Sequence, residues 1–217
     1  MYCRFKTVNL ILYSMVLSIV GQNINGLRSL VKINDVLAHF RRSANNVIVL
    51  QETFWVTDLI ERYIKPQWEG DMVFDNYNVS KRRGEAILCK KNVKIISSKS
   101  NGDGRTISAV VKHDDIHLNI IAYYAPNQDS ERCISHKSLN SFVHKVYPNI
   151  ILGDFNDILN PILDMSFGMK IYCKRSSSIL ENFIQDFNLV DIWRYRNPDK
   201  NSIRENKMFR DILNKVE

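Results

Sequence analysis

Short apolar runs recur along the chain, and each run leads into a cluster of small polar residues. The runs are VLSIV, VIVL, LNIIAY and NIIL, and the clusters after them are QNING, QET, YAPN and GDFN. A continuous aliphatic run of about four to eight residues is typical of a strand that is buried on both faces. We therefore expect four such strands, with polar side chains gathered where each strand ends.

Helical periodicity appears between these runs. It predicts helices within residues 27–40, 57–64, 130–146 and 178–187, the last opened by a capping box of Ser178 and Glu181. The stretch RTISAVVKHDDIHLNIIAYYA alternates instead around Asp114 and Asp115, which predicts a β-hairpin. The apolar spacing over residues 202–216 is that of an amphipathic helix. Strands mixed with helices and a hairpin favour an α/β sandwich over a purely doubly wound sheet.

The uncharged segment over residues 8–20, VNLILYSMVLSIV, has two interpretations. It resembles a signal-peptide core, although it is too short for a membrane span of about 20 residues. Cleavage near Gly21 would remove the strand that leads into Asn23, so we favour a strand preceded by a short leader. We expect a leader of uncertain status over residues 1–15, one domain over 16–199 and a divergent tail over 200–217.

The composition of the chain indicates which kind of molecule it binds. A chain of 217 residues with a net charge of +7 and a sequence pI of about 9.2 fits one globular domain that binds an anion, and nucleic acid is the first candidate. The four cysteines are isolated and lack zinc spacing, so we expect no disulfide framework and a reducing compartment.

The polar clusters supply oxygen ligands and hydrogen-bond donors but neither thiol nor imidazole. Carboxylate and amide oxygens suit Mg²⁺, and Glu52, placed directly after an apolar strand, is the best single ligand. Asp154 can orient and deprotonate a water, while Asn156 can donate to a phosphate oxygen. The structural alternatives are a solvated Glu52 and an ordinary Gly-Asp turn with a capping amide. The full set of candidates is Asn23, Asn25, Glu52, Tyr124, Asn127, Asp154 and Asn156.

Six motifs stand in a fixed order over residues 17–199: N-I-N-G-L, Q-E-T, R-G-x-A-I-L, Y-A-P-N, G-D-F-N and L-V-D-I-W-R. This order resembles the endonuclease/exonuclease/phosphatase superfamily, and most closely the apurinic-type endonuclease domain of LINE-type (non-LTR) retrotransposons. The resemblance implies a four-layered α/β sandwich, with two mixed β-sheets packed face to face and helices outside. It also implies a hydrolase that nicks DNA and leaves a 5′-phosphate and a 3′-hydroxyl.

The resemblance also implies a role for each matching residue. Glu52 would be the main ligand of Mg²⁺, for which Mn²⁺ could substitute, and Asn25 would lie beside the metal. Asp154, Asn156, Tyr124 and Asn23 would form the catalytic group, with Asn127 and Arg83 on the phosphate. Asp191 would lie near the DNA-facing side. The implied partners are duplex DNA, contacted through its backbone, and a reverse transcriptase domain encoded downstream. We expect a nuclear or cytoplasmic location without secretion or stable membrane association.

The chain departs from the family pattern at its C-terminal end. The family has a late Ser-Asp-His, whereas no Asp-His pair occurs here and no general-base histidine is found. His39, His117, His136 and His144 fall in helical or strand patterns and are expected at the surface. We therefore expect a domain that lacks its last strands. Two further readings stay open: a catalytically inactive, truncated remnant with at most weak DNA binding, and a lipid or phosphoinositide phosphodiesterase or phosphatase of the same fold.

Overall fold

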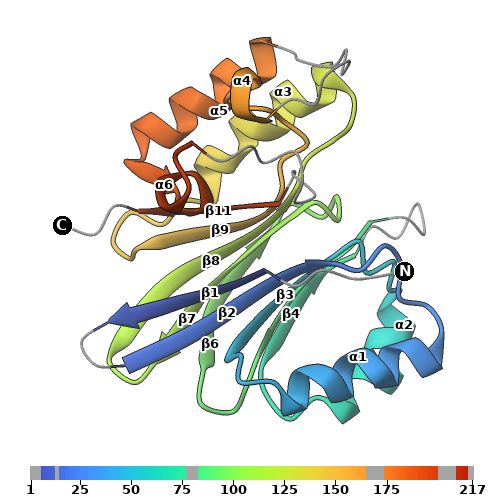
Figure 1. Cartoon of the computed structure of the whole chain (residues 1–217). Coiled ribbons are helices and arrows are strands. Elements are labelled where there is room, and N and C mark those ends of the chain that lie inside the picture. The colour runs from blue at the N-terminus through green and yellow to red at the C-terminus, as the bar shows by residue number, and fades with distance from the viewer. Residues whose placement is uncertain (1–5, 13–14, 77–82, 165–173, 200–208, 215–217) are drawn as a thin grey trace.

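The computed structural model describes residues 6–12, 15–76, 83–164, 174–199 and 209–214. They form two β-sheets with helices on both outer sides (Figure 1). The first sheet has the order β1-β2-β3-β5-β4, with β1 at Lys6–Leu12, β2 at Met15–Asn23, β3 at Val47–Gln51, β4 at Met72–Asp75 and β5 at Glu85–Cys89. The second has the order β10-β11-β9-β8-β7-β6, with β6 at Lys94–Ser100, β7 at Thr106–His113, β8 at Ile116–Tyr124, β9 at Asn149–Asp154, β10 at Leu189–Asp191 and β11 at Phe209–Asn214.

Each sheet is mixed. The pairs β2–β3 and β8–β9 are parallel, and the other pairs in both sheets are antiparallel. The hairpin predicted around Asp114 and Asp115 is the β7–β8 pair, in which His113 lies opposite Ile116. The predicted sandwich of two mixed sheets with outer helices is therefore confirmed.

Three apolar layers hold the sandwich together, because successive residues of a strand face opposite sides of the sheet. In β3, Val47 and Val49 pack between the two sheets, while Ile48 and Leu50 pack beneath the helices. The helices on this side are α1 (Leu30–Arg42), α2 (Thr57–Leu59), a π-helical turn over Ile60–Ile64 and a 3₁₀ turn over Lys65–Gln67. The second sheet is covered by α3 (Asp129–Ser138), a 3₁₀ turn over Leu139–Ser141 and α5 (Lys174–Asp186), with α4 (Pro161–Asp164) and α6 (Ile192–Arg196) nearby (Figure 1).

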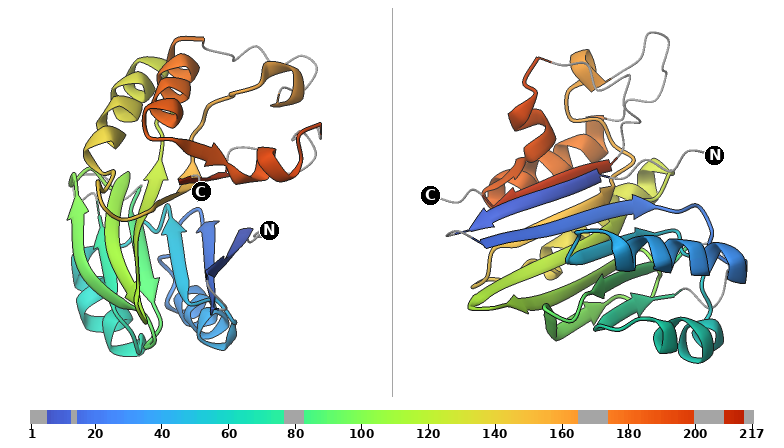
Figure 2. Two further views of the ribbon diagram at one scale, coloured as in Figure 1. Left: turned by 90° about the vertical axis from the view of Figure 1, so that its left-hand side faces the viewer. Right: turned by 60° about the horizontal axis from the view of Figure 1, so that its bottom comes forward.

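Both ends of the described chain contribute strands. Residues 6–12 form β1, which pairs with β2 from Lys6 opposite Gly21 to Leu12 opposite Met15, so the described residues of the segment that resembled a signal-peptide core lie in two antiparallel strands of the first sheet. The helix expected over residues 202–216 is wrong where the structure describes it, because β11 lies between β9 and β10 (Figure 2). Backbone pairing with two neighbouring strands outweighs the helical spacing of a short apolar pattern. The domain boundaries stay a prediction.

Two details of the predicted helices are also wrong. The helical periodicity over residues 27–40 includes Leu30 and Val31 in the apolar face, but their side chains are 48% and 68% exposed, and Ile33, Leu37 and Phe40 form the buried face of α1 instead. Ser178 does not cap α5, because the helix already begins at Lys174. No helix within the described ranges is long and apolar enough to cross a membrane.

Candidate active site

The polar clusters meet at one end of the sandwich because of the two parallel strand pairs. β2 and β3 end side by side, with Asn23 opposite Gln51, and β8 and β9 end side by side, with Tyr124 opposite Asp154. We call Asn23, Asn25 and Glu52 the first half of the site, and Tyr124, Asn127, Asp154 and Asn156 the second half.

The first half is held by contacts between side chains. The Nδ2 atom of Asn23 donates to Oε1 of Glu52 at 2.6 Å, and Oδ1 of Asn23 accepts from the backbone N–H of Asn25 at 3.0 Å. Asn25 and Glu52 have φ values of 44° and 52°, in the left-handed region that asparagine tolerates but glutamate rarely adopts. Backbone strain of this kind is often found at functional sites, where the surrounding structure holds it in place.

The second half is held by contacts to backbone atoms. The Nδ2 atom of Asn156 donates to the carbonyl of Ala125 at 2.8 Å, and Oδ1 of Asp154 accepts from the backbone N–H of Asn156 at 3.0 Å. The N–H of Ala125 donates in turn to the carbonyl of Asp154 at 2.8 Å. The Y-A-P-N and G-D-F-N loops are therefore fastened to each other.

The two halves touch through Tyr124. Its hydroxyl faces the Glu52 carboxylate, although Tyr124 ends β8 in one sheet and Glu52 follows β3 in the other. Burial raises the pKa of Tyr124, and the nearby charges of Glu52 and Asp154 raise it further, so the phenol stays protonated and acts as a hydrogen-bond donor.

The seam between the sheets requires glycine at position 153. A Cβ atom there would lie 1.8 Å from the carbonyl oxygen of Tyr123 and 2.7 Å from Nε2 of Gln51. The side chain of Gln51 crosses to the second sheet and donates to that same carbonyl at 2.5 Å. Gly153 thus lets β3, β8 and β9 approach closely enough to bring Glu52 and Tyr124 together.

The remaining predicted residues lie at the edge of this arrangement. Arg83 has a φ of 139° and its Nη1 donates to the carbonyl of Asp103 at 3.3 Å. Asn127 is exposed on the loop after β8, and its carbonyl accepts from Nη1 of Arg132 at 2.8 Å. Asp191 caps α6, since its Oδ1 accepts from the backbone N–H of Arg194 at 3.0 Å, which is a structural role.

Sequence reasoning missed Arg105. Its guanidinium carbon lies 5.5 Å from the centre of the Tyr124 ring, and its Nη1 donates to the Tyr124 carbonyl at 3.4 Å. Burial lowers the pKa of Arg105, and the charge of Arg83 lowers it further, so two cations lie close together beside Tyr124. The available signal was an arginine that opens the β7 hairpin strand, directly before Thr106.

The five histidines lie elsewhere. His39 is in the last turn of α1, His113 contacts the carbonyl of Asn92, and His117 and His144 stack on Tyr147. His136 was expected at the surface, but its side chain is fully buried behind the second half of the site. The expectation fails because His136 has polar partners within the core.

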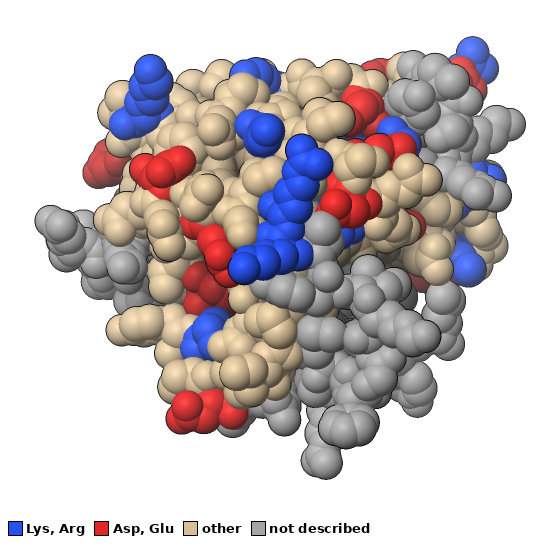
Figure 3. Space-filling model, turned by 90° about the horizontal axis from the view of Figure 1, so that it is seen from above, with Lys and Arg blue, Asp and Glu red and all other residues tan. Residues whose placement is uncertain are grey.

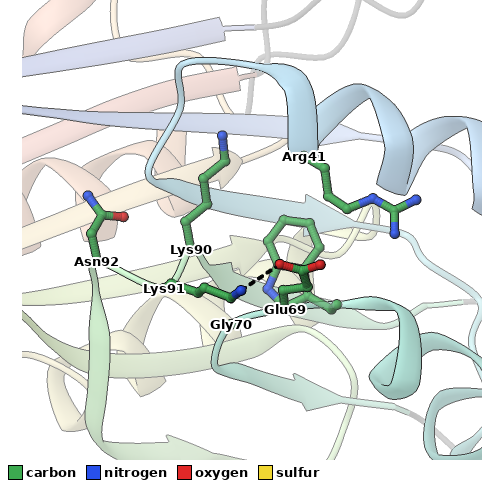
Figure 4. Close-up of a pocket in the computed structure, with 7 residues that line it drawn as sticks. Arg41, Glu69, Gly70, Lys90, Lys91 and Asn92 are labelled. Carbon is green, nitrogen blue, oxygen red and sulfur yellow. Dashed lines mark ion pairs between the residues drawn. The ribbon is translucent and has the colours of Figure 1, made fainter.

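A hollow of about 420 Å³ lies at the opposite end of β5, around Trp68 and Lys90 (Figure 4). Its cations already have partners: Lys91 pairs with Glu69 at 2.7 Å, Nη1 of Arg41 donates to the carbonyl of Gln67 at 2.9 Å, and Lys90 donates to the carbonyl of Ser43. The predicted chemistry therefore does not gather in this hollow.

Comparisons with known proteins agree with this geometry. No family model matches the sequence. The transposon TX1 uncharacterized 149 kDa protein of Xenopus laevis is 31% identical over 192 residues, which cover 85% of this chain and 14% of that protein. The chain thus spans a small part of this relative.

Three solved structures share the fold. The catalytic domain of Xenopus laevis APE2 gives a TM-score of 0.68 at 17% identity, covering 91% of this chain and 82% of that one. The AP endonuclease LMAP of Leishmania major gives 0.73 at 15%, covering 90% and 78%, and an AP endonuclease of Archaeoglobus fulgidus gives 0.67 at 17%, covering 91% and 86%. The chain therefore has the fold of AP endonucleases and is similar in sequence to part of a transposon protein.

Proposed function

We propose that this chain hydrolyses phosphodiester bonds of DNA in the presence of Mg²⁺, as the nicking endonuclease domain of a non-LTR retrotransposon. The observation that carries the proposal is the contact of Glu52 with Asn23 in its own sheet and with Tyr124 in the other. This contact joins a carboxylate, an amide and a phenol at the end of the sandwich where Asp154 and Asn156 also lie. The transposon relative and the fold of AP endonucleases support DNA as the substrate.

The residues divide the chemistry between them. Asp154 accepts a proton from the attacking water as the water oxygen bonds to phosphorus and the bond from phosphorus to the 3′-oxygen breaks. The 3′-oxygen takes its proton from solvent. The free N–H of the Asn156 amide and the Arg105 guanidinium would donate to phosphate oxygens, whose negative charge grows in the transition state, while the Tyr124 hydroxyl would stay on the Glu52 carboxylate.

The donor set fits a hard divalent cation. Among the residues that the structure describes, no three His, Cys, Asp or Glu side chains gather into a metal cluster. Mg²⁺ needs no such cluster, since it keeps several waters and is often held by one or two carboxylates. Glu52 would hold it, with the Asn25 amide oxygen close by. A bound Mg²⁺ would polarise the phosphate and stabilise charge on its oxygens.

The DNA would be bound chiefly through its backbone. The net charge of +7 favours phosphate contacts without sequence preference. The outer face over α3 and α5 carries charges of both signs and is not a uniform basic surface (Figure 3). We place the DNA at the strand ends, where Arg83 and Arg105 flank Tyr124. In an element of this type, the new 3′-hydroxyl would prime a reverse transcriptase encoded downstream.

The test is nicking of supercoiled plasmid by the purified chain with Mg²⁺, beside Glu52→Ala, Asp154→Ala and the matched control Glu69→Ala. Glu69 is exposed at the opposite end of the sandwich, where it pairs with Lys91. We expect Glu52→Ala and Asp154→Ala each to lower the rate on the order of 10²–10⁴-fold, and Glu69→Ala to leave it unchanged.

A catalytically inactive remnant is the competing reading, and the positions of the five histidines favour it. If wild type nicks no faster than Asp154→Ala at any Mg²⁺ concentration, the enzyme proposal is lost and the remnant reading stands. DNA binding is then measured separately, through its dependence on salt concentration.

A further inference from the structure

A buried polar network lies directly behind the second half of the site. It consists of Arg132 and His136 from α3, Asp157 from the loop after β9, and Ser176 and Ser177 from α5, and we call it the Arg132–Asp157 hub. Each of these side chains belongs to a residue that is at most 4% exposed. No predicted role of the site explains why an arginine, an aspartate and a histidine are buried together here.

Arg132 holds the Y-A-P-N loop from behind. Its Nη1 donates to the carbonyl of Asn127 at 2.8 Å and to that of Pro126 at 3.3 Å. Its Nη2 pairs with Asp129 at 3.1 Å. Because the guanidinium is a rigid planar fork, these contacts fix the backbone that carries the Asn127 side chain.

The same guanidinium reaches the G-D-F-N loop. The Nε atom of Arg132 donates to Oδ2 of Asp157 at 3.3 Å and to Oγ of Ser176 at 3.2 Å. One side chain therefore joins the loop after β8, the loop after β9 and the start of α5. On the solvent side of these loops, the contact from Asn156 to the Ala125 carbonyl makes the matching connection.

Both carboxylate oxygens of Asp157 accept hydrogen bonds. Nε2 of His136 donates to its Oδ2 at 3.1 Å, Oγ of Ser177 donates to its Oδ1 at 2.6 Å, and the backbone N–H of Ile158 donates to Oδ1 at 2.9 Å. Burial by itself raises the pKa of Asp157, but the hydrogen bonds, that of His136 foremost, outweigh burial and hold the pKa below its ordinary value. The carboxylate therefore stays charged opposite Arg132.

The hub also reaches the strand that carries Tyr124. Nδ1 of His136 contacts the Tyr123 hydroxyl at 2.8 Å, and that hydroxyl donates to Oγ of Ser135 at 3.0 Å. His136 therefore links Asp157 to Tyr123 through its two ring nitrogens. His136 and Asp157 form an Asp–His pair in space, but their burial keeps them from the substrate.

We infer that Arg132 is a positioning residue, which sets the distance between Asn127 and the Asp154–Asn156 loop across the phosphate site. The inference rests on the proposed function for its catalytic consequence and on the structure alone for the loop geometry. A buried ion pair adds little net stability compared with well-packed apolar side chains, so stability is a weak reason to bury these charges. The two contacts to backbone carbonyls of a site loop give them a specific task.

The test compares Arg132→Lys with the control Arg62→Lys. Arg62 pairs with Asp58 on the far side of the first sheet, with its side chain 81% exposed. Lysine keeps the charge but cannot make the five directed contacts of the fork. We expect Arg132→Lys to lower kcat for nicking on the order of 10–10²-fold with little change in KM, because catalysis is lost through misplacement and not through weaker DNA binding.

Hydrogen exchange provides the readout that does not depend on activity. We expect Arg132→Lys to speed exchange of the backbone amides of residues 127–129 and 156–158, with those of β3 and β5 unchanged. If wild type proves inactive but these amides still exchange faster, the proposed function fails and the positioning role stands.

Unchanged exchange at these amides, or an unchanged kcat in an active enzyme, would overturn the positioning role. Ser176→Ala removes one contact of Arg132 and keeps the test open if Arg132→Lys does not fold. It should shift exchange at the same amides in the same direction by a smaller amount, and no shift would again count against the role.

Discussion

Two buried carboxyl groups lie behind the candidate site, and their ionisation is shifted in opposite directions. Glu85 lies in β5 directly opposite Gln51, behind the first half, and burial raises its pKa well above the ordinary value. Gln51 offsets part of the rise, but within the described ranges neither carboxyl oxygen of Glu85 has full hydrogen-bond geometry. Asp157, behind the second half, is almost as buried, yet its pKa is lowered.

The difference shows that donors, and not depth, decide whether a buried carboxyl stays charged. Asp157 has hydrogen bonds from a histidine, two serines and a backbone N–H, and it faces Arg132. Glu85 has the charges of Glu52 and Asp75 nearby, and both favour its neutral form. An ion pair between Asp157 and Arg132 therefore lies behind the second half of the site, while the carboxyl group of Glu85, which favours its neutral form, lies behind the first half.

Among these substitutions, Asp157→Ala is expected to cause the largest loss of unfolding free energy. The substitution leaves Arg132 buried without its main counter-charge, which commonly costs about 3–5 kcal/mol of unfolding free energy. Urea unfolding at pH 7 measures the loss, with Asp129→Ala as the control because Asp129 pairs with the same arginine from a half-exposed position. A loss no greater than that of the control would mean that Asp157 does not anchor the hub.

Glu85→Gln is expected to raise the free energy of unfolding, in contrast to Asp157→Ala. A carboxyl whose folded pKa lies above its unfolded pKa costs stability as pH rises above the unfolded value, because the unfolded chain releases the proton first. Glutamine removes this cost, so the variant should gain on the order of 1–2 kcal/mol over wild type at pH 8 and almost nothing at pH 4.

Unfolding curves at both pH values check this prediction. A Glu85→Gln protein that is less stable than wild type at pH 8 would contradict the view that Glu85 is held neutral. Asp157 has the reverse linkage: its lowered pKa supplies stability at neutral pH, which is lost as pH falls through the folded value.

The site residues can be predicted from the sequence pattern, whereas the buried network behind the second half of the site cannot. Glu52, Asp154 and Asn156 follow apolar runs, so the pattern alone places them at strand ends, and the structure brings them to the same end. The hub joins Arg132, Asp157 and Ser176, which are far apart in sequence and follow no apolar run. Long-range contacts of this kind leave no periodic signal, and the same reason explains why β11 was mistaken for a helix.

The smallest effect is expected from a pair of neighbouring serines at the start of α5. Ser177 is buried and its Oγ donates to Asp157 at 2.6 Å, whereas Ser178 is half-exposed and its Oγ donates to the Lys174 carbonyl at 2.8 Å within the helix. Ser177→Ala removes one of several donors to a buried carboxylate, for a loss of about 1 kcal/mol.

Ser178→Ala should change the unfolding free energy by less than about 0.5 kcal/mol, because an interior hydroxyl bonded to its own helix adds little. Parallel urea titrations of the two variants make the comparison. Removing an N-cap residue costs about 1 kcal/mol. A loss of that size in Ser178→Ala would instead indicate that Ser178 is the N-cap, as the capping box in the sequence predicts, and that α5 begins after it. In that case Ser176 and Ser177 would precede the helix, and the second half of the site would lose the rigid element that holds Asp157 in place.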